Sequence, residues 1–332
     1  TPGYGSFYGE GDFIFNFNEI NDKIGQNNEK DKDILIDVSP SLRVENDKNV
    51  FVDSLKKLLS DSKNYIEINE LINEELKIYL NEFDKEKLDL NGIDEEKFKI
   101  KIKTIEKNIE NLLSAVILIT YYGDERYNKM LKKIIYRVFP TGTFSGQTIA
   151  ISLLYIPTLI LIYGIIITSL ESEKYDIIKE IVNMEDNKID SSHYYRDSDL
   201  LLTNLFNRIN YISSSFGKLF PDQNYRYPMN EYLYKYLQPI IDDILYIGDE
   251  YSDKYTNTEI LISIAYAIKN YNGKDYVWGP IGRYLYILGY GNKDINKLPI
   301  NSVISKIGLY DEISNKDDFI SKYNTFISKH FF

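Results

Sequence analysis

His193 is the side chain of this sequence best suited to acid–base chemistry. It lies in the polar stretch DSSHYYRDSD, close in sequence to Asp190, Arg196, Asp197 and Asp199. A histidine beside a carboxylate can work as a general acid–base pair. A polar loop that ends in a helix N-cap at Asp197 or Ser198 accounts for the same residues without catalysis. We therefore assign no catalytic residue and keep an enzyme that uses His193 as an alternative.

The stretch GTFSGQT, residues 142–148, is the nearest match to a phosphate-binding loop. It lacks the final Gly-Lys-Ser/Thr that supplies a charge and a metal-binding hydroxyl, so an entry turn before a helix is the better interpretation. The chain has no cysteine and two histidines, His193 and His330. This composition excludes thiolate nucleophiles, disulfides and zinc sites built from cysteine and histidine. We predict no cofactor and no metal site.

Trp278 is the only tryptophan, and it lies in the stretch DYVWGPIGRYLYI. As a structural motif, Trp278 would close a turn with Gly279 and Pro280, and Gly282 would let another part of the chain come close. Arg283 would then enter a helix, where it can bond carbonyls that end other helices or pair with a buried carboxylate such as Glu259. We favour this interpretation, in which the stretch joins two helices.

The alternative for the same stretch is a ligand site. Arg283 would anchor a phosphate or a carboxylate, with Trp278 as a platform and Tyr284 nearby. These three residues are the candidate ligand-binding residues. Open walls around them would favour the ligand site, whereas burial with satisfied hydrogen bonds would favour the joint.

The charge balance argues against nucleic acid as a partner of this chain alone. Of the 332 residues, 39 are basic and 50 are acidic, which gives a net charge of -11. Such a chain repels phosphate backbones unless a basic patch overrides the net charge, and the densest basic run alternates with isoleucines of core type. We expect a protein partner or self-association instead.

Apolar residues recur every three or four positions from Val50 onward, the pattern of amphipathic helices. The segment 94–122 is the longest, with Asp94 as its N-cap and Gly123 as its stop. Other helices are expected over 68–83, 175–183, 198–215, 230–247, 257–270 and within 299–332. Strand alternation is scarce. We predict an all-α multi-helix bundle over 49–332, preceded by an irregular N-terminal arm over 1–48.

Residues 138–170 contain no charged side chain. A stretch of this length can cross a bilayer, which makes a membrane span a formal alternative. Polar residues interrupt it, and Pro157 fits the first turn of a new helix, where its missing N–H costs little. We predict a central buried pair of helices, from about Ser145 to Tyr155 and from Pro157 to Leu170, and consider contact with a membrane the weaker interpretation.

Several stretches, taken in order, carry a resemblance to a known group of proteins. They are SLLYIPTLILIYGIIITSLESEKYDIIKEI, EYLYKYLQPIIDD, NTEILISIAYAIKN, VWGPIGRYLYI and KIGLYDE. The series resembles the helical C-terminal region of bacterial and archaeal multidomain proteins. There it follows an Alba-like, schlafen-type domain or a sirtuin-like domain. The shared pattern is a proline in an apolar helix, here Pro157, and a turn W-x-P-x-G-R, here Trp278, Pro280, Gly282 and Arg283.

The resemblance implies a function but no catalytic residue. Many of the similar proteins are suspected of antiviral defence, and their N-terminal enzymatic or DNA-binding domain has no counterpart in this chain. We therefore expect a non-catalytic helical interaction or scaffold module, or a sensor, in the cytoplasm of a prokaryote. A small-molecule sensor with a cleft near Trp278 and Arg283 is the main alternative.

Overall fold

The computed structural model describes residues 47–86, 91–142, 144–186, 200–271, 276–289 and 298–330. Within these ranges the regular structure is helical, and the only strand-like pairing is an isolated bridge between Glu185 and Leu200. The predicted all-α fold is therefore confirmed. The residues from Asn46 to Phe332 form one compact unit. The predicted arm over 1–48 falls almost wholly outside the described residues.

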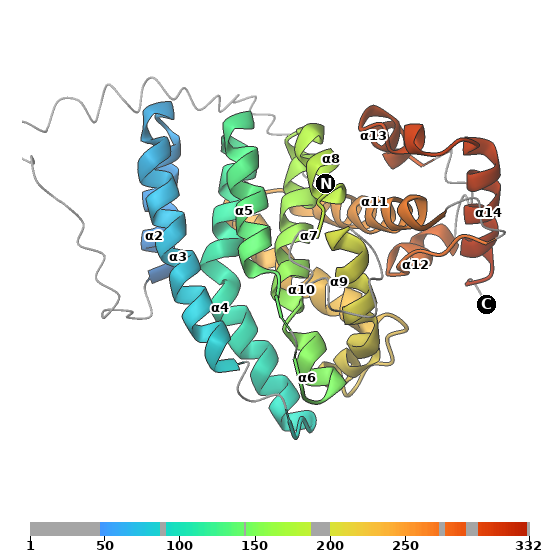
Figure 1. The fold of residues 1–332 in the computed structure, drawn as a ribbon, viewed down its shortest axis with the longest axis horizontal. Helices are drawn as coiled ribbons and strands as arrows, with labels where there is room; N and C mark the ends of the chain where they lie inside the picture. The colour runs from blue at the N-terminus through green and yellow to red at the C-terminus, as the bar shows by residue number, and fades with distance from the viewer. Residues whose placement is uncertain are drawn as a thin grey trace, which may run out of the picture. The chain divides into compact units, whose positions relative to one another are not determined.

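Figure 1 shows the helices in their order along the chain. They are α2 (Asp47–Leu59), α3 (Tyr65–Glu86), α4 (Glu95–Tyr122), α5 (Asn128–Val138), α6 (Thr148–Leu153), α7 (Ile156–Glu171), α8 (Tyr175–Val182), α9 (Leu201–Ile209), α10 (Pro228–Leu245), α11 (Tyr251–Tyr271), α12 (Tyr284–Gly289), α13 (Ile300–Lys306) and α14 (Lys316–Ser328). A ten-residue 3₁₀ segment, η3 (Asn210–Leu219), continues α9.

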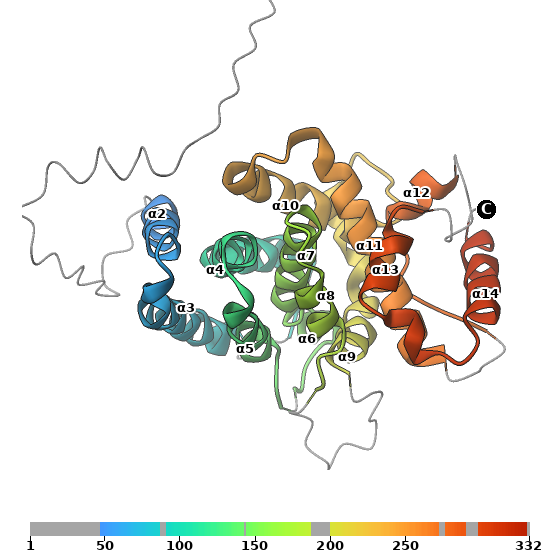
Figure 2. The same cartoon turned by 90° about the horizontal axis from the view of Figure 1, so that it is seen from above.

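The first half of the unit is built as two rows of helices (Figure 2). One row contains α2, α4 and α7, and the other contains α3, α5 and α8, with each helix packed on the next in its row and on its partner across. Helices α10 and α11 also pack on α7, and the C-terminal helices α12, α13 and α14 pack on α11. Helix α7 is therefore surrounded on every side by other helices.

The apolar stretch forms the predicted central pair. Helix α6 ends at Leu153, α7 begins at Ile156, and Pro157 lies in the first turn of α7 as expected. All residues of α7 from Ile156 to Leu170 are buried. The segment Thr148–Glu171 is long and apolar enough to cross a membrane. An 18-residue window within it has a mean hydropathy of 2.4, and 89% of that window is buried inside the structure.

Local signals set the ends of α4 where the sequence places them. The Asp94 side chain accepts a hydrogen bond from the Lys97 N–H at 2.8 Å, and the Gly123 N–H donates to the Ile119 carbonyl. Other ends differ from the predictions. The helix expected from 257 begins at Tyr251, and the helix expected over 198–215 passes into the 3₁₀ segment at Asn210.

Candidate functional site

The turn Tyr276–Arg283 leads into α12 and lies against α11. Gly279 comes so close to α11 that a Cβ atom there would lie 2.5 Å from the Ser263 carbonyl oxygen. At Gly282 a Cβ atom would lie 2.4 Å from Glu259 Oε1. Real Cβ atoms do not approach this closely, so a side chain at Gly279 would strike the main chain of α11, and one at Gly282 would have to displace the Glu259 and Asn230 side chains. The turn is thereby fixed at two points to one helix.

Glu259 is the buried acid that holds the start of α12. Only 3% of it is exposed. Its Oε2 accepts a hydrogen bond from the Tyr284 N–H at 2.8 Å, and its Oε1 accepts one from Asn230 Nδ2 at 2.7 Å. Burial raises the pKa of Glu259 to about 7, although these hydrogen bonds and the nearby Arg283 favour the charged form. Glu259 therefore links α10, α11 and α12.

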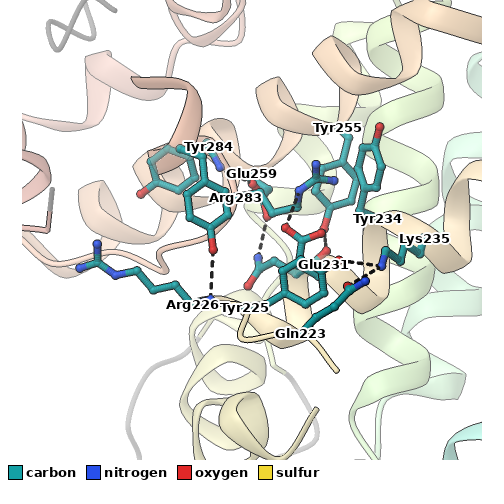
Figure 3. Close-up of polar contacts among 12 residues, drawn as sticks. Gln223, Tyr225, Arg226, Glu231, Tyr234, Lys235, Tyr255, Glu259, Arg283 and Tyr284 are labelled. Carbon is teal, nitrogen blue, oxygen red and sulfur yellow. Dashed lines mark hydrogen bonds and ion pairs between the residues drawn. The ribbon is translucent and has the colours of Figure 1, made fainter. Parts of the chain in front are cut away.

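Arg283 pairs with a different carboxylate from the one named in the sequence analysis. Its Nε lies 3.0 Å from Glu231 Oε1, on α10. Its Nε and Nη1 are buried and have no hydrogen-bond acceptor in suitable geometry, so the contact with Glu231 is electrostatic rather than a directed hydrogen bond. The guanidinium also lies 3.5 Å from the centre of the Tyr234 ring. Figure 3 shows Arg283, Glu231 and Tyr234 pointing toward one another.

The predicted pairing of Arg283 with a buried carboxylate holds, but the carboxylate is that of Glu231 and not that of Glu259. Both Glu231 and Glu259 are buried, and the sequence places them on separate helices at unknown separation. In the folded chain Glu259 faces the main chain of the turn, so its bonds go to N–H groups. Glu231 faces the side chain of Arg283.

Tyr284 is also part of the packed joint. It is 1% exposed, and its hydroxyl lies 3.2 Å from Ser263 Oγ, which in turn accepts a hydrogen bond from the Tyr323 hydroxyl at 2.7 Å. These three side chains tie α12 and α14 to α11. Neither Tyr284 nor Arg283 lines the cavity described next.

Trp278 lies at the edge of a cavity of about 920 Å³. The opposite wall is the segment from Phe206 to Asn230, and the near wall is formed by Trp278, Pro280 and Ile281. The indole is 39% exposed and packs edge-on against Tyr266, with ring centres 5.1 Å apart. Trp278 is therefore supported from one side and open on another.

The cavity wall is mixed in chemistry. Its aromatic side chains are Phe206, Phe220, Tyr225, Tyr227 and Trp278. Its amide, hydroxyl and charged side chains are Asn210, Ser213, Ser214, Asp222, Gln223, Asn224, Arg226 and Asn230. Walls that combine aromatic faces with a few hydrogen-bonding groups are typical of small-molecule sites.

The loop that precedes α10 is held in place by side chains of neighbouring elements (Figure 3). The Arg226 N–H donates to the Tyr286 hydroxyl at 3.1 Å, and Lys235 Nζ donates to the Tyr225 hydroxyl at 2.9 Å. Lys235 also lies 4.6 Å from the centre of the Phe220 ring. The far wall of the cavity is thus anchored to both α10 and α12.

The other sequence candidates do not join this site. His193, with its neighbouring aspartates and Arg196, lies outside the described residues. In the stretch 142–148, Gln147 directly precedes α6, and its Oε1 accepts a hydrogen bond from the Ile93 N–H at 2.7 Å. Across the described ranges, no group of three or more histidine, aspartate or glutamate side chains is placed to hold a metal ion.

Sequence reasoning did not identify the 206–230 wall. The run SSSFGKLFPDQNYRYP from Ser213 to Pro228 is dense in small, polar and aromatic residues between two apolar helices. The run is rich in amides and tyrosines and precedes a helix, and from this composition it could have been predicted as the wall of a binding site.

The structure defines an all-α protein with a cavity supported by a buried ionic joint. Comparisons with protein-family models, curated proteins and solved structures found no match. The functional interpretation therefore depends on the residues of the site.

Proposed function

We propose that the chain is a non-catalytic helical binding module, a sensor that recognises a small molecule in the cavity beside Trp278. The observation that carries this proposal is the cavity itself. Its volume of about 920 Å³ lies within the range of about 300–1,000 Å³ that is usual for ligand sites. A supported, partly exposed indole at its edge offers a flat apolar face.

The wall chemistry supports a ligand with a planar ring and several hydroxyl or amide groups. Trp278 and the wall tyrosines can stack on a ring, and the amides and serines can bond its polar edges. The charged side chains among the lining residues are one basic, Arg226, and one acidic, Asp222. Nucleosides and their monophosphates are the first class of molecules to test.

Binding can be followed with the only tryptophan of the chain. Adenosine, guanosine and their monophosphates are titrated into the full chain, and Trp278 emission is recorded alongside isothermal calorimetry. We expect saturable binding with a dissociation constant of about 100 μM or tighter. The proposal is wrong if none of these molecules binds at millimolar concentration.

A matched pair of variants tests where the molecule binds. Gly217 lines the cavity, and a Cβ atom there would meet nothing within 4 Å, so Gly217→Leu adds an apolar side chain at this wall with no clash at its Cβ. Lys218 follows it in the same 3₁₀ segment but does not line the cavity. Binding should be lost in Gly217→Leu and kept in Lys218→Leu. Equal loss in both would contradict a site in this cavity.

A protein partner or a second copy of the chain is the second candidate. Three aromatic side chains on the two segments that form the cavity are exposed, namely Tyr211 by 67%, Tyr276 by 68% and Trp278 by 39%. Exposed aromatic residues are enriched at protein interfaces. Native mass spectrometry of the chain from its own host separates the two candidates, since a retained small mass supports a ligand and a larger assembly supports a partner.

The setting in a prokaryotic defence system and a cytoplasmic location are proposals that rest on the resemblance of the sequence. The enzymatic alternative depends on His193, and the membrane alternative depends on residues 138–170. Purification without detergent would argue against the membrane alternative.

A further inference from the structure

Glu259 is a buried acid without a cation of its own. Its oxygens accept hydrogen bonds from neutral groups, namely the Asn230 amide, the Tyr284 N–H and the Arg283 main-chain N–H. The nearest guanidinium, that of Arg283, is paired with Glu231. A buried carboxylate held only by neutral donors is costly to keep charged.

We propose that Glu259 is a proton-sensitive latch for the turn that carries Trp278, so that gain or loss of one proton on this carboxyl moves the near wall of the cavity. The proposal adds regulation to the proposed ligand site. It rests on the proposed function only in giving the motion a purpose, namely control of ligand binding. The motion itself needs no ligand.

The donor set explains why one proton matters. A carboxylate accepts at both oxygens, whereas a neutral carboxyl carries one O–H that requires an acceptor. All three hydrogen-bond partners of Glu259 are donors, so protonation of either oxygen sets a donor against a donor. At Oε1, Asn230 can resolve the conflict by turning its amide so that Oδ1 accepts the proton, a turn that also changes its hydrogen bond with the Tyr163 hydroxyl. At Oε2, the Tyr284 N–H cannot become an acceptor and would have to move away.

The close packing of Gly282 transmits this change to the turn. A Cβ atom at Gly282 would lie 2.4 Å from Glu259 Oε1 and 2.5 Å from Asn230 Nδ2, so the main chain of the turn rests directly on this hydrogen bond. Asn230 also lines the cavity. Rearrangement of the pair therefore changes both the cavity wall and the support of the turn that holds Trp278.

The groups that face Glu259 leave it as one of two candidates for titration near neutral pH. They are Tyr163 on α7, Tyr227, Glu231, Tyr251, Tyr255, Arg283 and Tyr284. Burial raises the pKa of each of these tyrosines, which keeps them neutral. Burial also raises the pKa of the Glu231 carboxyl, while Arg283 opposes that rise. Glu231 must therefore be tested beside Glu259.

Trp278 reports on the latch because it is the only tryptophan of the chain. Its emission is recorded from about pH 5 to about pH 9 in the full chain, with excitation at the red edge where tyrosine does not absorb. We expect one transition near the pKa of about 7 of Glu259. In Glu259→Gln, which stays neutral at every pH, this transition should be absent.

Two further variants identify the carboxyl. Glu231→Gln should keep a transition, although its midpoint can shift as Arg283 loses its partner. Glu106→Gln is the distant control, because burial also raises the pKa of Glu106 but this residue lines a different cavity, between α4 and α10. A transition that persists in Glu259→Gln, or that disappears in Glu231→Gln alone, overturns the proposal.

A measurement on the unaltered chain covers the case in which Glu259→Gln does not fold. Carbon-13 NMR of the chain labelled at glutamate Cδ follows every glutamate carboxyl through the same pH range. One resonance should titrate together with the Trp278 emission. A tryptophan transition without a glutamate resonance of the same midpoint overturns the latch, whether or not any nucleoside binds.

Discussion

At the scale of single residues, Arg283 is the clearest test of the joint. Arg283→Ala removes the ion pair with Glu231 and the stacking on Tyr234, and it leaves the buried Glu231 carboxylate with only the weaker attraction of Lys235. We expect a loss of about 2–4 kcal/mol in the free energy of unfolding. Urea denaturation followed by circular dichroism gives this value directly.

The surface pair of Arg126 and Asp124 provides the control for Arg283. Its two side chains are about half exposed, and their attraction is screened by water. Arg126→Ala should leave the denaturation midpoint nearly unchanged. If Arg283→Ala were equally mild while ligand binding was lost, Arg283 would belong to the ligand site rather than to the joint.

The raised pKa of Glu259 predicts how the free energy of unfolding changes with pH. Its pKa is raised from 4.5 in the unfolded chain to about 7 in the folded chain, so the folded state holds this proton more tightly. The stability from this group is complete below about pH 4.5 and is lost as the pH rises through about 7. The loss amounts to about 3 kcal/mol at most.

Thermal unfolding of the chain and of Glu259→Gln, compared across this pH range, isolates the contribution of Glu259. The unaltered chain should lose more stability than the variant between pH 4.5 and 7, because the variant has no carboxyl at this position. Parallel pH profiles of the two proteins would show that the Glu259 carboxyl has its ordinary pKa in the folded chain.

At the scale of elements, Gly282 decides whether the turn fits against α11. Gly282→Ala places a methyl group within 2.4 Å of Glu259 Oε1. We expect a loss of about 1–3 kcal/mol, as for other overpacked sites, and a shift in Trp278 emission. Gly217→Ala is the matched control, since its Cβ meets nothing within 4 Å and should be close to neutral.

Pro157 is expected to matter little to the helix that it begins. It lies in the first turn of α7, where a proline removes no intrahelical hydrogen bond. Pro157→Ala should change the free energy of unfolding by less than about 1 kcal/mol, measured by urea denaturation. A loss of several kcal/mol would show that Pro157 fixes the turn between α6 and α7 in a way that the helix geometry does not explain.

At the scale of the whole molecule, the helical pattern of the sequence was sufficient for the fold class. The period of the apolar residues, the Asp94 cap and the uncharged stretch with Pro157 specify local structure, since each acts over a few neighbouring positions. The helix ends near Tyr251 and Asn210 were missed, because polar side chains there mask the pattern and packing on neighbouring helices sets the boundary.

Only half of the candidate site could be predicted from the sequence. Trp278, Gly282 and Arg283 stand out by type and spacing, so a turn of special role at these positions could be predicted. The opposite wall of the cavity comes from residues some 50 to 70 positions earlier in the chain, from Phe206 to Asn230. No local pattern shows that two such distant segments meet.

The sequence by itself thus determined the all-helical class, the buried central helix and the residues of the Trp278 turn, because each depends on short-range periodicity or on residue type. The tertiary structure alone decided which acid meets Arg283 and which one holds the Tyr284 N–H. It also decided that Trp278 faces a cavity while Tyr284 is buried. These choices depend on how α10, α11 and α12 pack, and contacts between distant segments are set by the whole fold.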